Sequence, residues 1–129
     1  SGMFAKYPKV RVFHSMLGGG FFAYKELLTP KRPKVQDAAG RFTDTGDDMT
    51  KALKENIFFE LSHAQPWGKA QLECAVKVLG ADHVVYGSSY PVRAEWLTEG
   101  AAFVQSLDLP DADKQLILAG NAARLYAIK

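Results

Sequence analysis

The sequence contains a single cysteine, Cys74, which excludes an internal disulfide. Cys74 falls among the apolar positions of a helical pattern, so we expect a buried and unreactive thiol. A chain without disulfides fits a reducing compartment, and we expect the protein to be cytoplasmic. The sequence also has no apolar run of transmembrane length, and Ser1–Lys6 lacks the features of a signal peptide. We therefore expect no membrane partner.

An excess of charge of one sign is also missing. The 129 residues include 16 Lys and Arg against 14 Asp and Glu, a formal net charge of +2. Such a small excess gives no strong attraction to nucleic acid, so we expect no nucleic-acid partner. The length suits one domain with a hydrophobic core.

Apolar periodicity predicts alternating strands and helices. In chain order we expect a helix end over residues 3–7, a strand over 10–13, a helix over 21–28, a strand over 57–62, a helix over 66–79, a strand over 83–86, and helices over 95–107 and 111–128. Residues 29–50 form a long loop excursion, after which Asp47 or Asp48 can cap a short helix to Lys54. The alternation predicts an α/β fold with a parallel sheet. Because three strands are few and the chain opens in a helix end, we expect residues 1–129 to be a single, partial domain of a larger fold.

The two longest helices also have predicted buried faces. In the helix over 66–79 the core positions are Ala70, Leu72, Ala75, Val76 and Leu79. In the last helix Asp111 is the expected cap, and the buried side is Leu116, Ile117, Ala119, Ala123 and Tyr126.

One stretch, Val84–Pro91, has the pattern of a buried parallel strand that ends in small residues, an aromatic residue and a proline. In such folds the functional groups lie just past the last residues of the strand. Ser88, Ser89 and Tyr90 are therefore expected near any active centre.

Three segments of the sequence carry a resemblance to a known family. Tyr7–Val12 with Met16–Gly20 is similar to the motif YPKLRVV…HLGGG, Gly80–Pro91 is similar to GADRVLFGSDYP, and Gly120–Leu125 is similar to GNAARLL. In this order and spacing they resemble the amidohydrolase-related (amidohydrolase 2) family, in the branch that includes aminocarboxymuconate-semialdehyde decarboxylase. The resemblance covers nearly the whole chain.

The resemblance implies a (β/α)₈ TIM barrel of the metal-dependent hydrolase type, of which this chain supplies about three β/α units, the last strands and the closing helices. The family's His-x-His pair and fifth-strand histidine lie upstream, and the only histidines here are His14, His63 and His83. Met16 stands where the family has a histidine, and Ser89 where it has a metal-binding aspartate. A thioether and a neutral hydroxyl are poor ligands for a hydrolytic metal. We expect no metal in this chain alone, and zinc or another divalent ion only if the site is completed elsewhere.

The candidate catalytic residues are His63 and Ser89. His63 follows a strand at the end where sites form, although a plain loop histidine is the alternative. A serine-hydrolase interpretation of Ser89 and Tyr90 has little sequence support, because no histidine adjoins them and no Gly-x-Ser-x-Gly elbow is present.

Candidate substrate- or anion-binding residues are Met16, Gly18, Gly19, Gly20, Tyr90 and Arg93. The three glycines open a helix, so their N–H groups can bind an anion. The alternative, which we favour, is close packing where a Cβ would clash. Arg93 and Trp96 follow the third strand and can line the same mouth, or Arg93 can be a solvated loop residue.

Three further polar residues lie near the predicted strands. His14 shares its strand parity with Met16 and is expected to be a hydrogen-bonded core histidine, or to lie one layer below the missing histidine. His83 precedes its strand and is expected at the surface. Glu60 either faces solvent on an edge or pairs with an arginine.

These observations leave three functions open. The chain is the C-terminal portion or a degenerate homologue of an amidohydrolase-related protein, without catalysis of its own. Alternatively it is part of an active hydrolase or decarboxylase for a small-molecule substrate, completed by an N-terminal half or a partner chain. In the third interpretation it is a non-enzymatic binding module that self-associates through its sheet edges and the inner-face residues Val12, Phe58 and Val85, so we expect a homo-oligomer.

Overall fold

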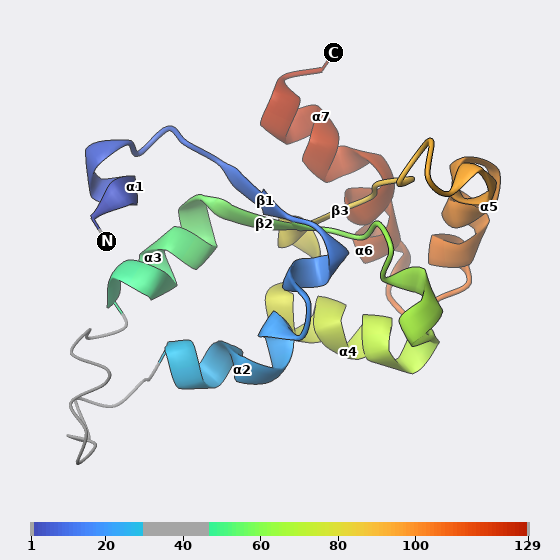
Figure 1. Ribbon diagram of the computed structural model, residues 1–129, viewed down its shortest axis with the longest axis horizontal. Helices are drawn as coiled ribbons and strands as arrows, with labels where there is room; N and C mark the ends of the chain where they lie inside the picture. The colour runs from blue at the N-terminus through green and yellow to red at the C-terminus, as the bar shows by residue number, and fades with distance from the viewer. Residues whose placement is uncertain (1, 30–46, 129) are drawn as a thin grey trace.

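The computed structural model describes residues 2–29 and 47–128 (Figure 1). Its elements are α1 (Met3–Lys6), β1 (Val12–His14), η1 (Met16–Gly18), α2 (Phe21–Leu28), α3 (Asp47–Glu55), β2 (Ile57–Glu60), η2 (Gln65–Trp67), α4 (Lys69–Leu79), η3 (Ala81–His83), β3 (Val84–Val85), α5 (Ala94–Gln105), α6 (Asp111–Gln115), the π-turn η4 (Leu116–Gly120) and α7 (Asn121–Tyr126). The mixed α/β order with a parallel sheet is confirmed. Residues 30–46, most of the predicted loop excursion 29–50, lie outside the described residues. None of the described helices combines the length and apolar character that a membrane crossing requires.

The sheet sets the two faces on which everything else packs. Its strands run parallel in the order β1-β2-β3. Val12, Phe13 and His14 pair with Ile57, Phe58 and Phe59, and Phe59 and Glu60 pair with Val84 and Val85. Registered partners in a parallel pair share a face, and side chains alternate along each strand. One face therefore carries Val12, His14, Ile57, Phe59 and Val84, and the other carries Phe13, Phe58, Glu60 and Val85.

The first face holds the core. Ile57, Phe59 and Val84 belong to one buried cluster with residues of α3, α4 and the last helices, and Figure 1 shows α2 and α4 on this side of the strands. On α4, the predicted core positions Leu72, Ala75, Val76 and Leu79 are buried.

Two sequence predictions on α4 are wrong, because Ala70 and Cys74 are both exposed. Each lies two residues from Leu72, which places it about 200° around the helix from that buried side chain. Lying within an apolar stretch therefore did not predict burial for these two residues. Their burial depends on the angular position of each side chain around the helix axis.

The second face is covered at its amino-terminal end by α7, which Figure 1 shows on the opposite side of the strands from α2 and α4. Tyr126 stacks on Phe13 with ring centroids 5.8 Å apart, and the Arg124 guanidinium lies 6.0 Å from the centre of the Phe58 ring. Val12 does not share this face with Phe58 and Val85 as predicted; Phe13 does.

The structure contradicts the core interpretation of His14 and the surface prediction for His83. His14 is exposed at the end of the edge strand β1, with its ring 6.0 Å from Phe59. His83 is largely covered rather than at the surface, because its ring stacks 5.0 Å from Phe58 and its Nδ1 is hydrogen-bonded to the Ile57 carbonyl at 2.9 Å.

The last helical stretch is one helix with a π-bulge, because the backbone stays right-handed helical on both sides of the bulge. This π-turn separates α6 from α7, and because this turn holds an extra residue it shifts the buried positions. Ile117 is buried as predicted, whereas Ala119 and Tyr126 are exposed. Pro110 occupies the cap position, and Asp111, the predicted cap, is the first helical residue.

Two buried asparagines tie the strand starts in place. The Asn56 amide donates to the carbonyls of Pro8 and Val10, at 3.0 and 2.8 Å, on the segment entering β1. The fully buried Asn121 amide donates to the carbonyls of Ala81 and Val84, at 2.7 and 2.8 Å, where β3 begins. Buried amides require acceptors, and here these acceptors are backbone carbonyls. Each amide therefore secures the entry to one edge strand.

Replacing Asn121 with alanine leaves the Ala81 and Val84 carbonyls without their donor. We expect the free energy of unfolding to fall by about 2 kcal/mol or more, since a buried unsatisfied polar group costs roughly 1–3 kcal/mol. The matched control is Gln115→Ala, which truncates an exposed amide on α6. Urea unfolding followed by circular dichroism measures both variants, and equal losses would contradict the role of the Asn121 amide.

Candidate functional site

The carboxyl ends of the three strands share an unusual backbone conformation. Among the described non-glycine residues, positive φ occurs at Met16, Leu17, His63, Ser89 and Ala127. Met16, His63 and Ser89 each lie a few residues after the end of β1, β2 and β3. Holding a non-glycine residue at positive φ costs roughly 1–3 kcal/mol, and such residues tend to cluster at functional sites. Backbone strain is thus concentrated at the sheet edge where parallel folds hold their sites.

The structure brings the two predicted catalytic residues together. Ser89 Oγ and His63 Nε2 are hydrogen-bonded, and both side chains are half-buried. The residues are 26 positions apart, so the absence of a neighbouring histidine in the sequence concealed the pair. The edge of the Trp96 ring lies against the imidazole, with the ring centroids 5.6 Å apart.

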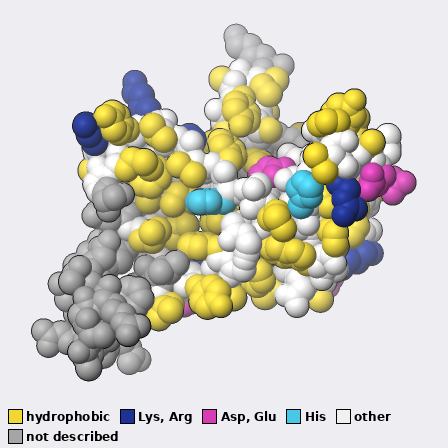
Figure 2. Space-filling view, viewed as in Figure 1, with side chains coloured by type: hydrophobic (Ala, Val, Ile, Leu, Met, Phe, Trp, Pro, Cys, Tyr) yellow, Lys and Arg dark blue, Asp and Glu magenta, His cyan; other side chains and the backbone are white. Residues whose placement is uncertain are grey.

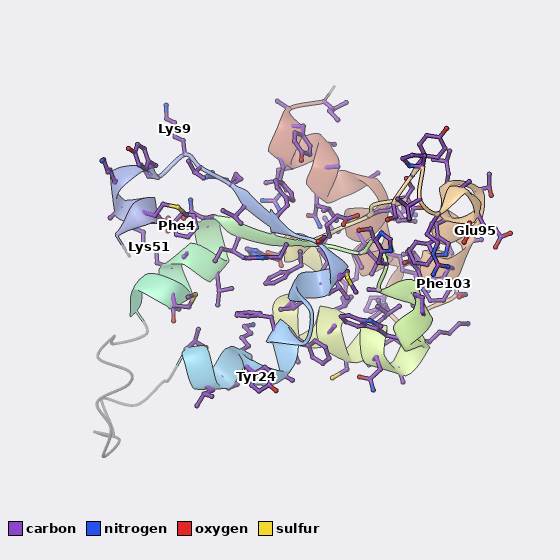
Figure 3. The ribbon with its side chains drawn as sticks, viewed as in Figure 1. Phe4, Lys9, Tyr24, Lys51, Glu95 and Phe103 are labelled. Carbon is purple, nitrogen blue, oxygen red and sulfur yellow. The ribbon has the colours of Figure 1, made fainter. Side chains whose placement is uncertain are left out.

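Arg93 lies next to this pair but is held at the surface. Its guanidinium is 4.7 Å from the centre of the Trp96 ring and 3.3 Å from a Glu95 carboxylate oxygen. Both charged side chains are about half exposed, so the ion pair contributes little to stability. Figure 2 shows imidazole, basic and acidic side chains gathered at the α5 end of this face, and Figure 3 shows Glu95 pointing away from the sheet.

Glu60 fits neither of its predicted environments. It is half-buried, and its carboxylate accepts hydrogen bonds from the Ser62 N–H, at 3.1 Å, and from the Ser62 hydroxyl. It also lies directly against Gly87, where an added Cβ would overlap the carboxylate. Position 87 therefore requires glycine because Glu60 fills the space beside it.

The glycine segment offers few free N–H groups. Gly18 and Gly19 donate to the carbonyls of Ser15 and Met16, at 3.0 and 2.8 Å. A Cβ on Gly18 would lie 3.1 Å from the Phe59 ring, whereas one on Gly19 would meet nothing within 4 Å. Close packing accounts for Gly18, and a positive φ accounts for Gly19.

The other predicted substrate-binding residues are accessible. Met16 is exposed, Tyr90 is 63% exposed, and a Cβ on Gly20 would meet only the far end of Tyr24 at 4.0 Å. The Tyr90 N–H donates to Ser88 Oγ at 3.3 Å. A role in substrate or anion binding stays a prediction for these positions.

The residues at this edge do not fit a divalent metal by themselves. Within residues 2–29 and 47–128, no three His, Cys, Asp or Glu side chains are placed to hold one. Beside the Met16 thioether and the neutral Ser89 hydroxyl, the edge holds the His63 imidazole, whose Nε2 is already bonded to Ser89. The Glu60 carboxylate at the end of β2 is already bonded to Ser62. Zinc and manganese prefer carboxylate and imidazole donors.

Tyr86 fixes the helix that carries Trp96. Its hydroxyl donates to the Trp96 carbonyl, and a Cβ on Gly100 would overlap the Tyr86 ring. Burial raises the pKa of the Tyr86 phenol above its ordinary value. Strand β3 and helix α5 are thereby joined through one phenol.

The cavities lie away from this edge. One, of about 250 Å³, is lined by residues of α1 and α3 that include Phe4, Lys51 and Asn56. Figure 3 shows Phe4 and Lys51 at the end of the molecule opposite Glu95. This cavity contains none of the predicted site residues.

Comparisons with known proteins agree on one family. The model of the amidohydrolase family matches residues 1–128. Among solved structures, an amidohydrolase described as putative from Staphylococcus aureus matches with 21% identity and a TM-score of 0.70 over 97% of this chain. A dihydroxybenzoic acid decarboxylase from Polaromonas sp. JS666, solved with manganese and 2-nitroresorcinol, matches with 21% identity and a TM-score of 0.72 over 99%. A 5-carboxyvanillate decarboxylase from Sphingomonas paucimobilis matches with 19% identity and a TM-score of 0.69 over 100%.

The chain spans 37% of the length of each of these three solved proteins. No curated protein matches the sequence.

The raised pKa of Tyr86 predicts a pH-dependent stability. The folded state holds the Tyr86 proton more tightly than the unfolded state. The protonated phenol therefore makes its full contribution to the free energy of unfolding below a pH of about 10, and this contribution is lost as the pH rises further. We expect the free energy of unfolding to fall less steeply above that pH in Tyr86→Phe than in the wild type. Urea unfolding across the alkaline range measures the slope, with Tyr24→Phe, an exposed phenol, as the control. Parallel slopes in wild type and Tyr86→Phe would refute the assignment.

Proposed function

The chain belongs to the amidohydrolase family, and from this membership we propose that it is the C-terminal portion of a (β/α)₈ barrel that does not perform the family's metal-dependent chemistry by itself. The proposal is supported by the parallel order β1-β2-β3. It is also supported by the match to about a third of each larger solved protein.

The observation that carries the proposal is the Ser89–His63 hydrogen bond. Ser89 occupies the position at which the resembling motif has an aspartate. Its oxygen is neutral, and it engages the His63 imidazole instead of leaving that ring free as a ligand. A neutral hydroxyl bound to an imidazole orients that ring and shares its proton, but it supplies no charge to hold a cation.

A second candidate is an active hydrolase or decarboxylase completed by a missing N-terminal half. The manganese-containing decarboxylases among the structural neighbours favour it. In such an assembly the divalent ion would be held by residues outside this chain. Met16, Tyr90 and Arg93 would line the mouth, where a small-molecule substrate would bind.

A third candidate is a self-associating module. Within the described residues, β1 and β3 each have a strand neighbour on one side only. Unpaired strand edges favour association with another chain, so a homo-oligomer or the N-terminal half of the barrel is the partner we propose.

Metal analysis tests the main proposal. After incubation with manganese or zinc and gel filtration, we expect the purified chain to retain far less than one equivalent of metal. Ser89 carries no charge, and the Glu60 carboxylate is already hydrogen-bonded to Ser62. About one tightly held ion per chain would overturn the proposal.

The variant Ser89→Asp separates the first two candidates, with Ser106→Asp as a control that adds the same charge at an exposed position. We expect neither variant to bind metal alone. If Ser89→Asp gains a stoichiometric ion when co-expressed with the N-terminal half of a solved neighbour, and Ser106→Asp does not, the completed-enzyme candidate is favoured.

A further inference from the structure

We propose that Ser89 and His63 form a nucleophile–base pair that accepts the acyl group of small aryl esters. This activity goes beyond the proposed function, because it needs neither a metal nor an N-terminal half. It rests on four features of the described residues: the turn that carries Ser89, the fixed imidazole, a backbone donor beside the hydroxyl, and aromatic surface at the mouth.

The first feature is the turn. Ser89 lies between strand β3 and helix α5, with φ at +58°. A serine held in a strained strand-to-helix turn at the carboxyl edge of a parallel sheet is the arrangement of the nucleophile elbow in serine hydrolases. Around Ser89 the first glycine of the usual motif is present as Gly87, and Pro91 stands in place of the second. The surrounding packing must therefore help to hold Ser89 in this conformation.

The second feature is the base. His63 also has φ at +58°, and its Nε2 is hydrogen-bonded to Ser89 Oγ. The Trp96 ring that contacts the imidazole is itself buried. The Trp96 backbone is held in place, because its N–H donates to the Arg93 carbonyl at 3.2 Å and its carbonyl accepts from the Tyr86 hydroxyl. The ring contact and the hydrogen bond to Ser89 together restrict the orientation of the imidazole.

The third feature is the backbone donor. In elbow turns the N–H of the residue after the nucleophile binds the oxyanion. Here that residue is Tyr90, whose N–H donates to Ser88 Oγ at 3.3 Å, which is long for a hydrogen bond. The oxygen of a developing tetrahedral intermediate is a stronger acceptor than this hydroxyl and can replace it.

The fourth feature sets the substrate class. The Tyr90 ring is largely exposed beside the pair, and Trp96 carries the Arg93 guanidinium on its outer side. Flat aromatic surface at the mouth favours a substrate with an aromatic leaving group. An aryl oxide also leaves without a dedicated general acid, which this site does not provide.

The reaction balances with these groups alone. His63 Nε2 takes the Ser89 proton as Oγ bonds to the ester carbonyl carbon, and collapse of the intermediate breaks the bond to the aryl oxygen and releases an aryl oxide. The proton on Nε2 passes to solvent or to this leaving group. Water, deprotonated by His63, then attacks the Ser89 ester, releases the carboxylic acid and restores the hydroxyl.

The test uses the full chain and p-nitrophenyl acetate. We expect a burst of p-nitrophenol, a mass increase of one acetyl group mapped by peptide analysis to Ser89, and loss of both in Ser89→Ala. His63→Ala should slow acylation by roughly 10²–10⁴-fold, the usual contribution of a positioned general base. Ser106→Ala, an exposed hydroxyl outside the site, should behave as wild type. Hydrolysis that is unchanged in Ser89→Ala, or acetyl groups found only on lysines or on His63, would overturn the proposal.

A thiol variant keeps the test decisive if alanine variants fold poorly. In a Cys74→Ala background, Ser89→Cys should react with iodoacetamide at neutral pH on the order of tenfold faster than Ser106→Cys, because the imidazole lowers the pKa of a neighbouring thiol. The advantage should disappear when His63 is also replaced by alanine. Equal rates for the two thiols would overturn the pairing. Neither outcome bears on metal content, so failure here is distinguishable from failure of the proposed function.

Discussion

The hydrogen bonds of two buried asparagine amides to the backbone at the strand starts are the interactions on which the rest of the molecule depends. Asn56 fixes the segment entering β1 against the start of β2, and Asn121 fixes the start of β3 against α7. Neighbouring strands lie about 4.8 Å apart, so strands aligned at one end deliver their turns side by side at the other. The contact between His63 and Ser89 is thus set in part by two amides at the opposite edge of the sheet.

The sequence predicted the helices and strands well because their signals are local. Apolar spacing located α2, α4 and β2, and Leu72 and Val76 were correctly placed in the core. Local signals failed to predict burial where it depends on the angular position around the helix axis. Cys74, for example, lies on the solvent side of α4. They failed again at the π-turn, which no spacing rule anticipates.

The candidate site was only half predictable. His63 and Ser89 were both singled out, but their contact depends on the register of β2 against β3, which pairs Glu60 with Val85 and cannot be counted along the chain. Glu60 was misjudged for a different reason, because its partner Ser62, two residues on, is brought to the carboxylate by the local turn. The edge therefore carries the segment that resembles the family's motif, while Ser89 supplies no negative charge at the position where that motif has an aspartate.

The exposed thiol of Cys74 gives the chain a single site for thiol-specific labelling. Because the sequence holds no second cysteine, one maleimide dye attaches at one point, on the outward side of α4. In a Trp67→Phe variant, which removes the tryptophan of η2 next to α4, energy transfer from Trp96 to that dye would report the spacing between α4 and α5. Cys74, which the sequence pattern placed in the interior, can thus carry a label that reports how these helices are positioned relative to each other.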